Sequence, residues 1–292
     1  MTSSVKTIGL FGKYGSRETG GELRKLCDFL QAHKLRVLLE EMTAEMIESA
    51  NLPSRPLADI GKEIDLAIVI GGDGTLLNVA RNLADSRVPL IGVNLGRLGF
   101  LADIPAEHMI AEIGRILQGD YEVESRFLLS ADITRDKKIV HSSKALNDVI
   151  INKGELARLI EFETYLDDKF VNSMLADGII VATPTGSTAY ALSAGGPLLH
   201  PTLAAIVVVP ICPHTLSDRP IVVSSDSVVD IVMTGTRDQR AHVTFDGQLH
   251  YPLRDHDCVS VRRATHPVQF WRPAERNHYE VLRAKLHWGG KF

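Results

Sequence analysis

A glycine-rich junction between a strand and a helix constrains this chain more than any other feature. Residues 65–78 read DLAIVIGGDGTLLN, in which an apolar β-branched run stops at glycines and an apolar helical pattern follows from about Thr75. A strand that passes directly into a helix is typical of parallel α/β folds, which bind ligands at the carboxyl ends of their strands. Glycine at Gly71, Gly72 and Gly74 costs backbone entropy, which indicates a site that needs bare backbone.

The first 120 residues continue this alternation of strand and helix patterns. Apolar β-branched runs occupy residues 5–11, 35–40, 65–70 and 88–94. Apolar residues with helical spacing lie between the first two runs and again after the fourth. Strands that alternate with helices predict a doubly wound parallel sheet with helices on both faces.

From about residue 121 the pattern changes to period-2 alternation with polar breaks, which predicts a mostly antiparallel, β-sandwich-like domain. The run PVQFW at residues 267–271 is counted among its strands. The last stretch is helical again, and we expect it to pack back on a domain because a short isolated helix is marginal in water. The predicted regions are an α/β nucleotide-binding domain at 1–120, a β-rich domain at 121–270 and a helical segment at 271–292.

Composition and charge argue against several classes of partner. The chain has 292 residues, 45% of them hydrophobic, and a net charge of -4, so neither nucleic acid nor an anionic membrane is an expected partner. No apolar run approaches the roughly 20 residues of a membrane span, and the start lacks a secretory signal pattern. The three cysteines, Cys27, Cys212 and Cys258, are odd in number and far apart, which argues against a disulfide framework. We therefore expect a cytoplasmic protein.

Several common site motifs are missing. The chain has no G-x-x-x-x-G-K-[ST] phosphate loop and no H-E-x-x-H motif, and its eleven histidines lack ligand spacing, so we expect no metal site built by the protein itself. Gly9, Gly12 and Gly15 follow the first strand but lack the G-x-G-x-x-G spacing of a dinucleotide site. A flexible turn near a phosphate-bearing ligand is the interpretation that we favour for them.

The glycine loop joins bare amides to one carboxylate. Amides at a helix N-terminus bind phosphate, whereas Asp73 would repel it unless the carboxylate holds a divalent cation or accepts a proton from an attacking hydroxyl. An aspartate that caps the helix is the ordinary alternative, but a cap leaves the three glycines unexplained. A second polar cluster, SMLADGIIVATPTGSTAYALSAGGP at residues 173–197, offers hydroxyls and glycines that suit ribose or phosphate and are equally common in plain loops.

Four segments together resemble the NAD kinase family, in its bacterial type. They are GGDGT, the pair Asn147–Asp148, DGIIVATPTGSTAYALSAGGP, and FDGQ at Phe245–Gln248, in this order and over nearly the whole chain. The first segment is also similar to one in diacylglycerol and sphingosine kinases and in phosphofructokinases, whereas TPTGSTAY followed by GGP is much more specific. The resemblance implies transfer of the γ-phosphoryl group of ATP to the 2′-hydroxyl of the adenosine ribose of NAD, which gives NADP.

The resemblance also implies roles for single residues. Asp73 would be the general base that accepts the ribose proton. The residues that would bind the phosphates of ATP are Gly71, Gly72, Gly74 and Thr75. The residues that would bind NAD, most of them in the β-rich domain, are Asp73, Gly74, Asn147, Asp148, Arg158, Asp177, Thr188, Ala189, Tyr190, Ser193 and Gln248. Many relatives have Glu where this chain has Asp148, whose side chain reaches one methylene less far.

The resemblance further implies Mg²⁺ that arrives with ATP, because no phosphate-loop lysine is present to neutralise the charge of the nucleotide. Members of the family are usually homodimers or homotetramers, and a site shared between subunits would make assembly necessary for activity. Two alternatives remain open at this point. One is a lipid kinase with the same glycine loop, and the other is a non-catalytic NAD-binding regulator or an NAD-dependent oxidoreductase that uses GLFGKYG.

Overall fold

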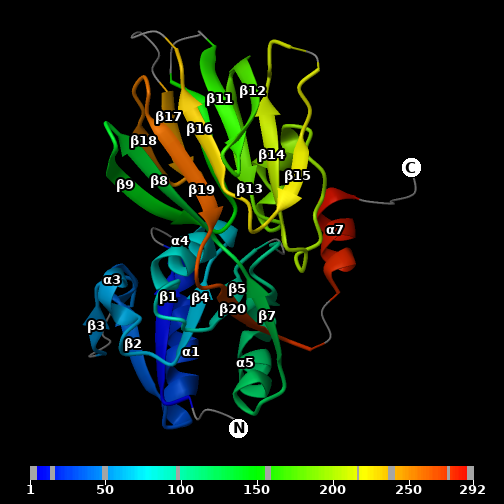
Figure 1. Ribbon diagram of the computed structural model, residues 1–292. Coiled ribbons are helices and arrows are strands. Elements are labelled where there is room, and N and C mark those ends of the chain that lie inside the picture. The colour runs from blue at the N-terminus through cyan, green and yellow to red at the C-terminus, as the bar shows by residue number, and fades with distance from the viewer. Residues whose placement is uncertain are drawn as a thin grey trace. The chain divides into compact units, whose positions relative to one another are not determined.

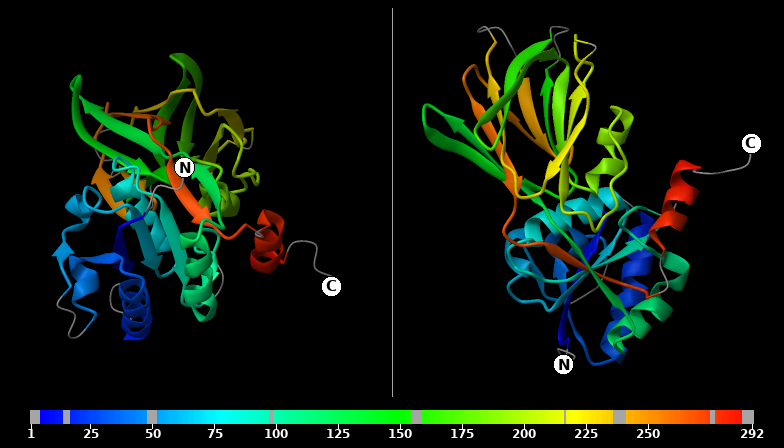
Figure 2. Two further views of the ribbon diagram at one scale, coloured as in Figure 1. Left: turned by 90° about the horizontal axis from the view of Figure 1, so that it is seen from below. Right: turned by 45° about the vertical axis from the view of Figure 1, so that its right-hand side comes forward.

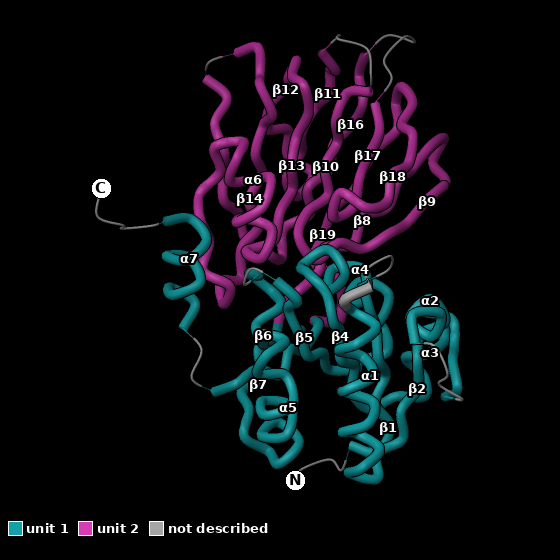
Figure 3. Tube along the Cα trace, turned by 180° about the vertical axis from the view of Figure 1, so that it is seen from behind, with its two compact units in different colours: residues 1–125, 268–292 teal, residues 126–267 magenta. Residues whose placement is uncertain are grey.

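The chain divides into two compact units in the computed structural model. The first comprises residues 1–125 and 268–292, and the second comprises residues 126–267 (Figure 3). The structure describes residues 5–13, 17–47, 52–96, 99–154, 159–215, 217–235, 241–274 and 277–287. Each unit has its own apolar core.

The first unit is built on an eight-stranded sheet in the order β3-β2-β1-β4-β5-β20-β7, with β6 also paired to β5 (Figure 1). Its strands are β1 (Thr7–Gly12), β2 (Arg36–Glu40), β3 (Ser54–Arg55), β4 (Leu66–Ile70), β5 (Leu90–Asn94), β6 (Ile104–Pro105), β7 (Glu122–Arg126) and β20 (Val268–Arg272). The pairs from β3 through to β20, and β5 with β6, are parallel. The four predicted strands of the first 120 residues are thus β1, β2, β4 and β5.

Helices cover both faces of this sheet. The helical elements of this unit are α1 (Arg17–Ala32), α2 (Glu41–Ala44), α3 (Leu57–Ile60), α4 (Asp73–Leu83), the 3₁₀ turn η1 (Ala106–His108), α5 (Met109–Leu117) and α7 (His278–Leu286). Leucines of α1 and isoleucines of α5 share one core with Ile8 and Leu10 of β1, so these two helices lie on one face (Figure 2). On the other face Gly92 of β5 leaves room for Leu76 of α4. The predicted doubly wound sheet is confirmed.

Two local predictions differ from the structure. Helix α4 begins at Asp73, two residues before the predicted start, because the extended Gly72 is its N-cap. The run at residues 267–271 is β20, which pairs parallel to β5 through Phe270 and Leu90 instead of joining the antiparallel strands. Phe270 and Trp271 point to opposite faces of β20 and both are buried, as is usual for a strand inside a parallel sheet.

The second unit is an antiparallel sandwich, as predicted. Its two six-stranded sheets have the orders β15-β14-β13-β10-β17-β18 and β12-β11-β16-β19-β8-β9, and their inner faces share one core. Its elements are β8 (Leu129–Arg135), β9 (Lys138–Ala145), β10 (Asp148–Lys153), β11 (Ile160–Leu166), β12 (Lys169–Ala176), β13 (Gly178–Ala182), η2 (Gly186–Thr188), α6 (Tyr190–Ser193), β14 (Ala205–Ile211), β15 (Ile221–Ser224), β16 (Val229–Met233), β17 (Ala241–Phe245), β18 (Leu249–Pro252) and β19 (Cys258–Arg263).

The predicted C-terminal helix is present as α7. The side chain of Asn277 caps it by accepting a hydrogen bond from the amide of Tyr279, and Val281 and Leu282 are buried. None of the helices in the described ranges has the length and apolar character that crossing a bilayer requires.

Candidate active site

The glycine loop stands at the carboxyl end of β4, a strand buried along its whole length. The Gly71 amide donates to the Val93 carbonyl at 2.8 Å, which ties the loop to β5. A Cβ on Gly71 would lie 2.7 Å from Oγ1 of Thr75, so packing requires glycine there. A Cβ on Gly72 would meet nothing within 4 Å, and its φ of −91° suits any residue. The fold therefore leaves the glycine at Gly72 unexplained, whereas a ligand that approaches the exposed amide explains it.

The carboxylate of Asp73 is held by backbone amides. Its Oδ2 accepts from Phe100 at 2.9 Å, and its Oδ1 accepts from Leu101 at 3.0 Å and from Ala102 at 3.1 Å. A Cβ on Gly99 would lie 2.1 Å from Oδ1, so only glycine lets this segment close over the carboxylate. Asp73 is the first residue of α4 and does not cap it. A carboxylate has about four acceptor positions, so Oδ2 keeps capacity for a further donor.

A lysine that the sequence analysis did not single out starts beside the glycine loop. The amide of Lys13, which follows β1, donates to the Ile70 carbonyl at 2.9 Å. The Cβ of Lys13 lies 3.3 Å from the position that a Cβ on Gly71 would take. The GLFGKYG turn thus brings an exposed cation to the edge of the sheet where Asp73 lies, while Gly15 of that turn lies outside the described residues.

In the second unit the Asn147–Asp148 pair meets the FDGQ turn. The carboxylate of Asp246 accepts from the amides of Leu146 at 3.2 Å and Asn147 at 2.7 Å, and the Asp246 amide donates to the Asp148 carbonyl at 3.0 Å. Asp246 and Gly247 have φ of 53° and 63°, as a tight turn between β17 and β18 requires. The sequence analysis took Gln248 from this motif and missed Asp246, whose Asp-Gly step was the available signal.

The TPTGS segment packs on the same pair. The Thr183 amide donates to the Asn147 carbonyl at 2.9 Å, and its hydroxyl donates to the Leu146 carbonyl at 2.6 Å. A Cβ on Gly186 would lie 2.1 Å from the Asn147 carbonyl oxygen, so glycine is required for this close approach. Three segments that are far apart in the sequence therefore converge around Asn147.

Asp148 is the buried acid of this cluster, with 3% of its surface exposed. Burial, and then the negative charge of Asp246, raise the pKa of Asp148 to about 7. Both effects disfavour the charged form of the carboxyl group. Asp148 thus exchanges its proton near neutral pH.

The remaining predicted NAD-binding residues fall into two places. Thr188 and Ala189 are partly buried and directly precede α6, which begins with Tyr190, 44% exposed, and ends with the exposed Ser193. The exposed ring of Tyr190 has a face available for stacking.

Asp177 lies at the other end of the ladder between β10 and β13. Asp148 pairs with Ala182 at one end of this ladder, whereas Asp177 directly precedes Gly178 at the other, about 16 Å away along the strand. The carboxylate of Asp177 forms an ion pair of 2.5 Å with Lys153. The structure thus separates Asp177 from the cluster around Asn147. Arg158 lies outside the described residues.

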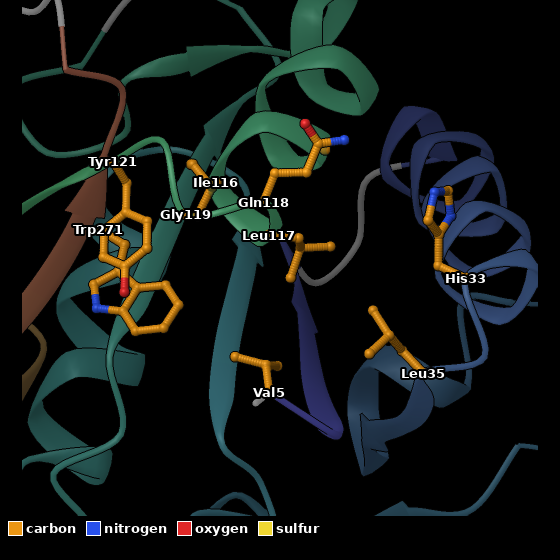
Figure 4. A pocket seen from close by; sticks show the side chains of 10 residues that line it. Val5, His33, Leu35, Ile116, Leu117, Gln118, Gly119, Tyr121 and Trp271 are labelled. Atoms are coloured by element: carbon orange, nitrogen blue, oxygen red, sulfur yellow. The ribbon is translucent and has the colours of Figure 1, made fainter. Parts of the chain in front are cut away.

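A pocket of about 400 Å³ opens at the opposite, amino-terminal edge of the parallel sheet (Figure 4). The ring of Tyr121 stacks on that of Trp271, with 4.2 Å between their centroids. The pocket is lined by Val5, His33, Leu35, Gly114, Ile116, Leu117, Gln118, Gly119, Tyr121 and Trp271. These lining residues include no lysine or arginine, so the pocket does not suit the phosphates of a nucleotide.

Within the described ranges, no group of three or more His, Cys, Asp or Glu side chains is placed to hold a metal ion. Cys27, Cys212 and Cys258 are free thiols. Burial raises the pKa of Cys27 and that of Cys258 to about 11, with smaller contributions from Asp28 and Asp230. Neither thiol is therefore a reactive thiolate at neutral pH.

The fold and the site define a class. A doubly wound sheet with bare amides and an oriented carboxylate at its carboxyl edge, followed in the chain by an antiparallel sandwich with a second polar cluster, is a two-domain nucleotide-binding architecture.

Comparisons with known proteins identify the family within that class. The model of the ATP-NAD kinase N-terminal domain matches residues 8–121, and that of the ATP-NAD kinase C-terminal domain matches residues 146–272. The NAD kinase of Thiobacillus denitrificans is 48% identical over 291 residues, which cover 100% of both chains. The NAD kinase of Nitrosospira multiformis is 47% identical over 99% of this chain and 98% of the relative. The chain belongs to the NAD kinase family and is a phosphotransferase.

Solved structures agree with this assignment. A crystal structure of an NAD kinase from Archaeoglobus fulgidus in complex with ATP matches with a TM-score of 0.77 at 25% identity, over 96% of this chain and 98% of that one. A crystal structure of yeast NADH kinase complexed with NADH matches with a TM-score of 0.92 at 23% identity, over 100% and 90% of the two chains, and shows the shared fold.

Proposed function

We propose that the chain transfers the γ-phosphoryl group of ATP to the 2′-hydroxyl of the adenosine ribose of NAD, with Asp73 as the general base. One observation carries this proposal. Three amides fix both oxygens of the Asp73 carboxylate beside an exposed glycine amide, and Oδ2 keeps an acceptor position. A hydroxyl that donates to this position loses its proton to Asp73 as its oxygen attacks the phosphorus.

The phosphates of ATP are assigned to the amino end of α4. Gly71, Gly72, Gly74 and Thr75 lie in the loop and first turn, where the helix dipole favours negative charge. The amides of Gly71 and Thr75 donate to the carbonyls of Val93 and Gly72, so the exposed Gly72 and Gly74 are the glycines that a phosphate can approach, and Thr75 offers its hydroxyl. Lys13, whose Cβ lies near Gly71, can bring a cation to this loop. Mg²⁺ carried in by ATP would neutralise phosphate charge when bound. Full activity in excess chelator would contradict this assignment.

The NAD ligands are assigned to the second unit, together with Asp73 and Gly74. Asn147 and Asp148 offer an amide and a carboxyl group to ribose hydroxyls, and Tyr190 offers its exposed ring to adenine. The further members of the set are Arg158, Asp177, Thr188, Ala189, Ser193 and Gln248.

The position of Asp177 supports a homodimer or homotetramer. Because it lies about 16 Å along the sheet from Asp148, an NAD site that uses both residues is more easily completed by two copies of the chain. We place the protein in the cytoplasm, which its free thiols support. Full activity of a dilute monomer would overturn the shared site.

The decisive experiment incubates the purified protein with NAD, ATP and Mg²⁺ and measures NADP. The matched control variant is Asp59→Asn, which removes an exposed aspartate of the same unit that forms an ion pair with Lys62, just after α3. We expect Asp59→Asn to keep the rate and Asp73→Asn to lose it. Equal rates for both variants would remove Asp73 from the chemistry, and absence of NADP with the unaltered protein would refute the proposed reaction.

A further inference from the structure

A buried arginine lies close to the segment that holds Asp73. Arg272 is the last residue of β20, and the parallel pairing of Phe270 with Leu90 places it level with Gly92 of β5, two residues before the end of that strand. Its side chain is 12% exposed. Nη1 lies 2.5 Å from Oε2 of Glu124, and Nε lies 3.2 Å from Oδ2 of Asp103.

Asp103 connects this arginine to Asp73. It directly follows the three amides that hold the Asp73 carboxylate, and its side chain is 5% exposed. The Asp103 amide donates to the Gly92 carbonyl at 3.2 Å, and a Cβ on Gly92 would lie 2.9 Å from Cα of Ala102. The segment is thus anchored on β5 by its backbone and on Arg272 by the side chain of Asp103.

Arg272 compensates the negative charge of the carboxylates around it. Burial lowers the pKa of Arg272, while Glu124 and then Asp73 oppose this shift. A guanidinium stays protonated at physiological pH. It therefore supplies a cation among the carboxylates of Asp103, Glu124 and Asp73, and its removal leaves buried negative charge without compensation, which is strongly unfavourable.

The hydrogen bonding of Arg272 is incomplete for a purely structural residue. Within the described ranges Nη2 has no hydrogen-bond partner, and the contact from Nε to Asp103 lacks hydrogen-bond geometry. Buried side-chain donors usually find partners, and an exception calls for an explanation. A charge placed for its effect on the carboxylates around it provides one.

We propose that Arg272 is a positioning residue for phosphoryl transfer. Through Asp103 it holds residues 99–102 closed over the Asp73 carboxylate, and its charge keeps that carboxylate in place beside the other acids. The inference rests on the proposed role of Asp73 as the base. Arg272 itself acts through Asp73 and is not assigned a contact with substrate.

The first test compares Arg272→Gln and Arg272→Lys with a control of similar burial. Arg135→Gln breaks the ion pair of Arg135 with the fully buried Asp257 in the second unit, where the Arg135 side chain is 18% exposed. We expect Arg272→Gln to lower kcat by about 10²-fold, the cost of displacing a catalytic group by about 1 Å, with little change in the KM of ATP. Arg272→Lys restores part of the loss because it restores the charge. Loss of kcat to the same extent in Arg135→Gln would overturn the proposal.

The second test measures hydrogen exchange at the amides of Phe100, Leu101 and Ala102, which needs no catalysis. We expect faster exchange at these amides in Arg272→Gln and unchanged exchange in Arg135→Gln. Unchanged exchange in Arg272→Gln overturns the proposal, and so does faster exchange with normal kcat.

In the Asp73→Asn background Arg272→Gln should cost little further activity, because both act through one group. If Asp73→Asn alone is fully active, the proposed base fails while the exchange result still reports on Arg272.

Discussion

Two aspartates, one in each unit, occupy opposite electrostatic environments. Asp73 is partly exposed, and its two oxygens accept three backbone hydrogen bonds. Asp148 is buried beside a second carboxylate, that of Asp246, which accepts the hydrogen bonds of the nearby amides of Leu146 and Asn147. Amides that point at a carboxylate stabilise its charged form, whereas burial and a like charge stabilise its neutral form.

The difference teaches that residue type alone does not assign a role to an acid. An acceptor for a proton must be charged when the hydroxyl arrives and must be held in one orientation, and the segment after Gly99 provides that orientation for Asp73. A group that is neutral for part of the physiological pH range can donate as well as accept, and Asp148 has this property. We therefore assign the chemistry to Asp73 and binding to Asp148.

We expect the largest effect on activity from substitution of Asp73. General-base catalysis is worth about 10²–10⁴-fold, or roughly 3–5 kcal/mol, and we expect Asp73→Asn to lower kcat by this range. The carboxamide also turns an NH₂ group toward an amide donor, so we expect about 1–3 kcal/mol lower stability, which leaves the protein folded. Steady-state kinetics and urea unfolding measure the two effects. Near-normal turnover in a folded variant would contradict the assignment.

Substitution of two glycines near Asp73 separates the position of its carboxylate from the binding of phosphate. A Cβ on Gly99 would collide with Oδ1 of Asp73, whereas a Cβ on Gly72 has open space. We expect Gly99→Ala to displace the carboxylate and lower kcat by about 10²-fold. Gly72→Ala should keep the stability and raise the KM of ATP, because the methyl group stands where phosphate approaches. Rates measured over a range of ATP concentrations separate the two, and an unchanged kcat in Gly99→Ala would show that the carboxylate is not held by this segment.

The sequence predicted elements whose signal is local. The continuous apolar run before Gly71 is β4, and the spacing of Leu23, Leu26 and Leu30 is that of α1. Contacts between residues that are far apart in the sequence could not be predicted from local patterns. Phe100 binds the Asp73 carboxylate from 27 residues away, and Gly99 reads as an ordinary loop glycine because its reason is that carboxylate.

Strand β20 illustrates the same limit at longer range. Its residues alternate in a way that fits either kind of sheet, and only pairing with β5, which lies far back in the sequence, decides for the parallel one. The sequence around Arg272 therefore gives no indication that its side chain meets Asp103 and Glu124. The family motifs located the polar segments of both units, whereas the partner of each carboxylate became visible only in three dimensions.

The raised pKa of Asp148 predicts that the free energy of unfolding depends on pH. Its pKa is about 7 in the folded protein against 3.8 as the ordinary value, so the folded state binds more protons than the unfolded state between these two pH values. Stability therefore falls as pH rises from about 4 to 7, by up to about 1.4 kcal/mol per pH unit. Asp148→Asn should remove this slope, as measured by urea unfolding at a series of pH values. Identical slopes in the variant and the unaltered protein would show that Asp148 is not the buried neutral acid.

The smallest expected effect concerns Gln248, the exposed residue after the Asp246–Gly247 turn. Its backbone amide closes the turn by donating to the Phe245 carbonyl at 2.9 Å, and this bond survives in Gln248→Ala. The variant thus loses only the carboxamide, which as one hydrogen bond to NAD is worth about 0.5–1.5 kcal/mol. We expect the KM of NAD to rise by roughly 2- to 10-fold, with kcat and the KM of ATP unchanged. Asp246→Ala should be far more damaging, because the amides of Leu146 and Asn147 lose their acceptor. If Gln248→Ala instead lowers kcat while the KM of NAD stays constant, the turn belongs to the chemistry, and the division of roles between the two units fails.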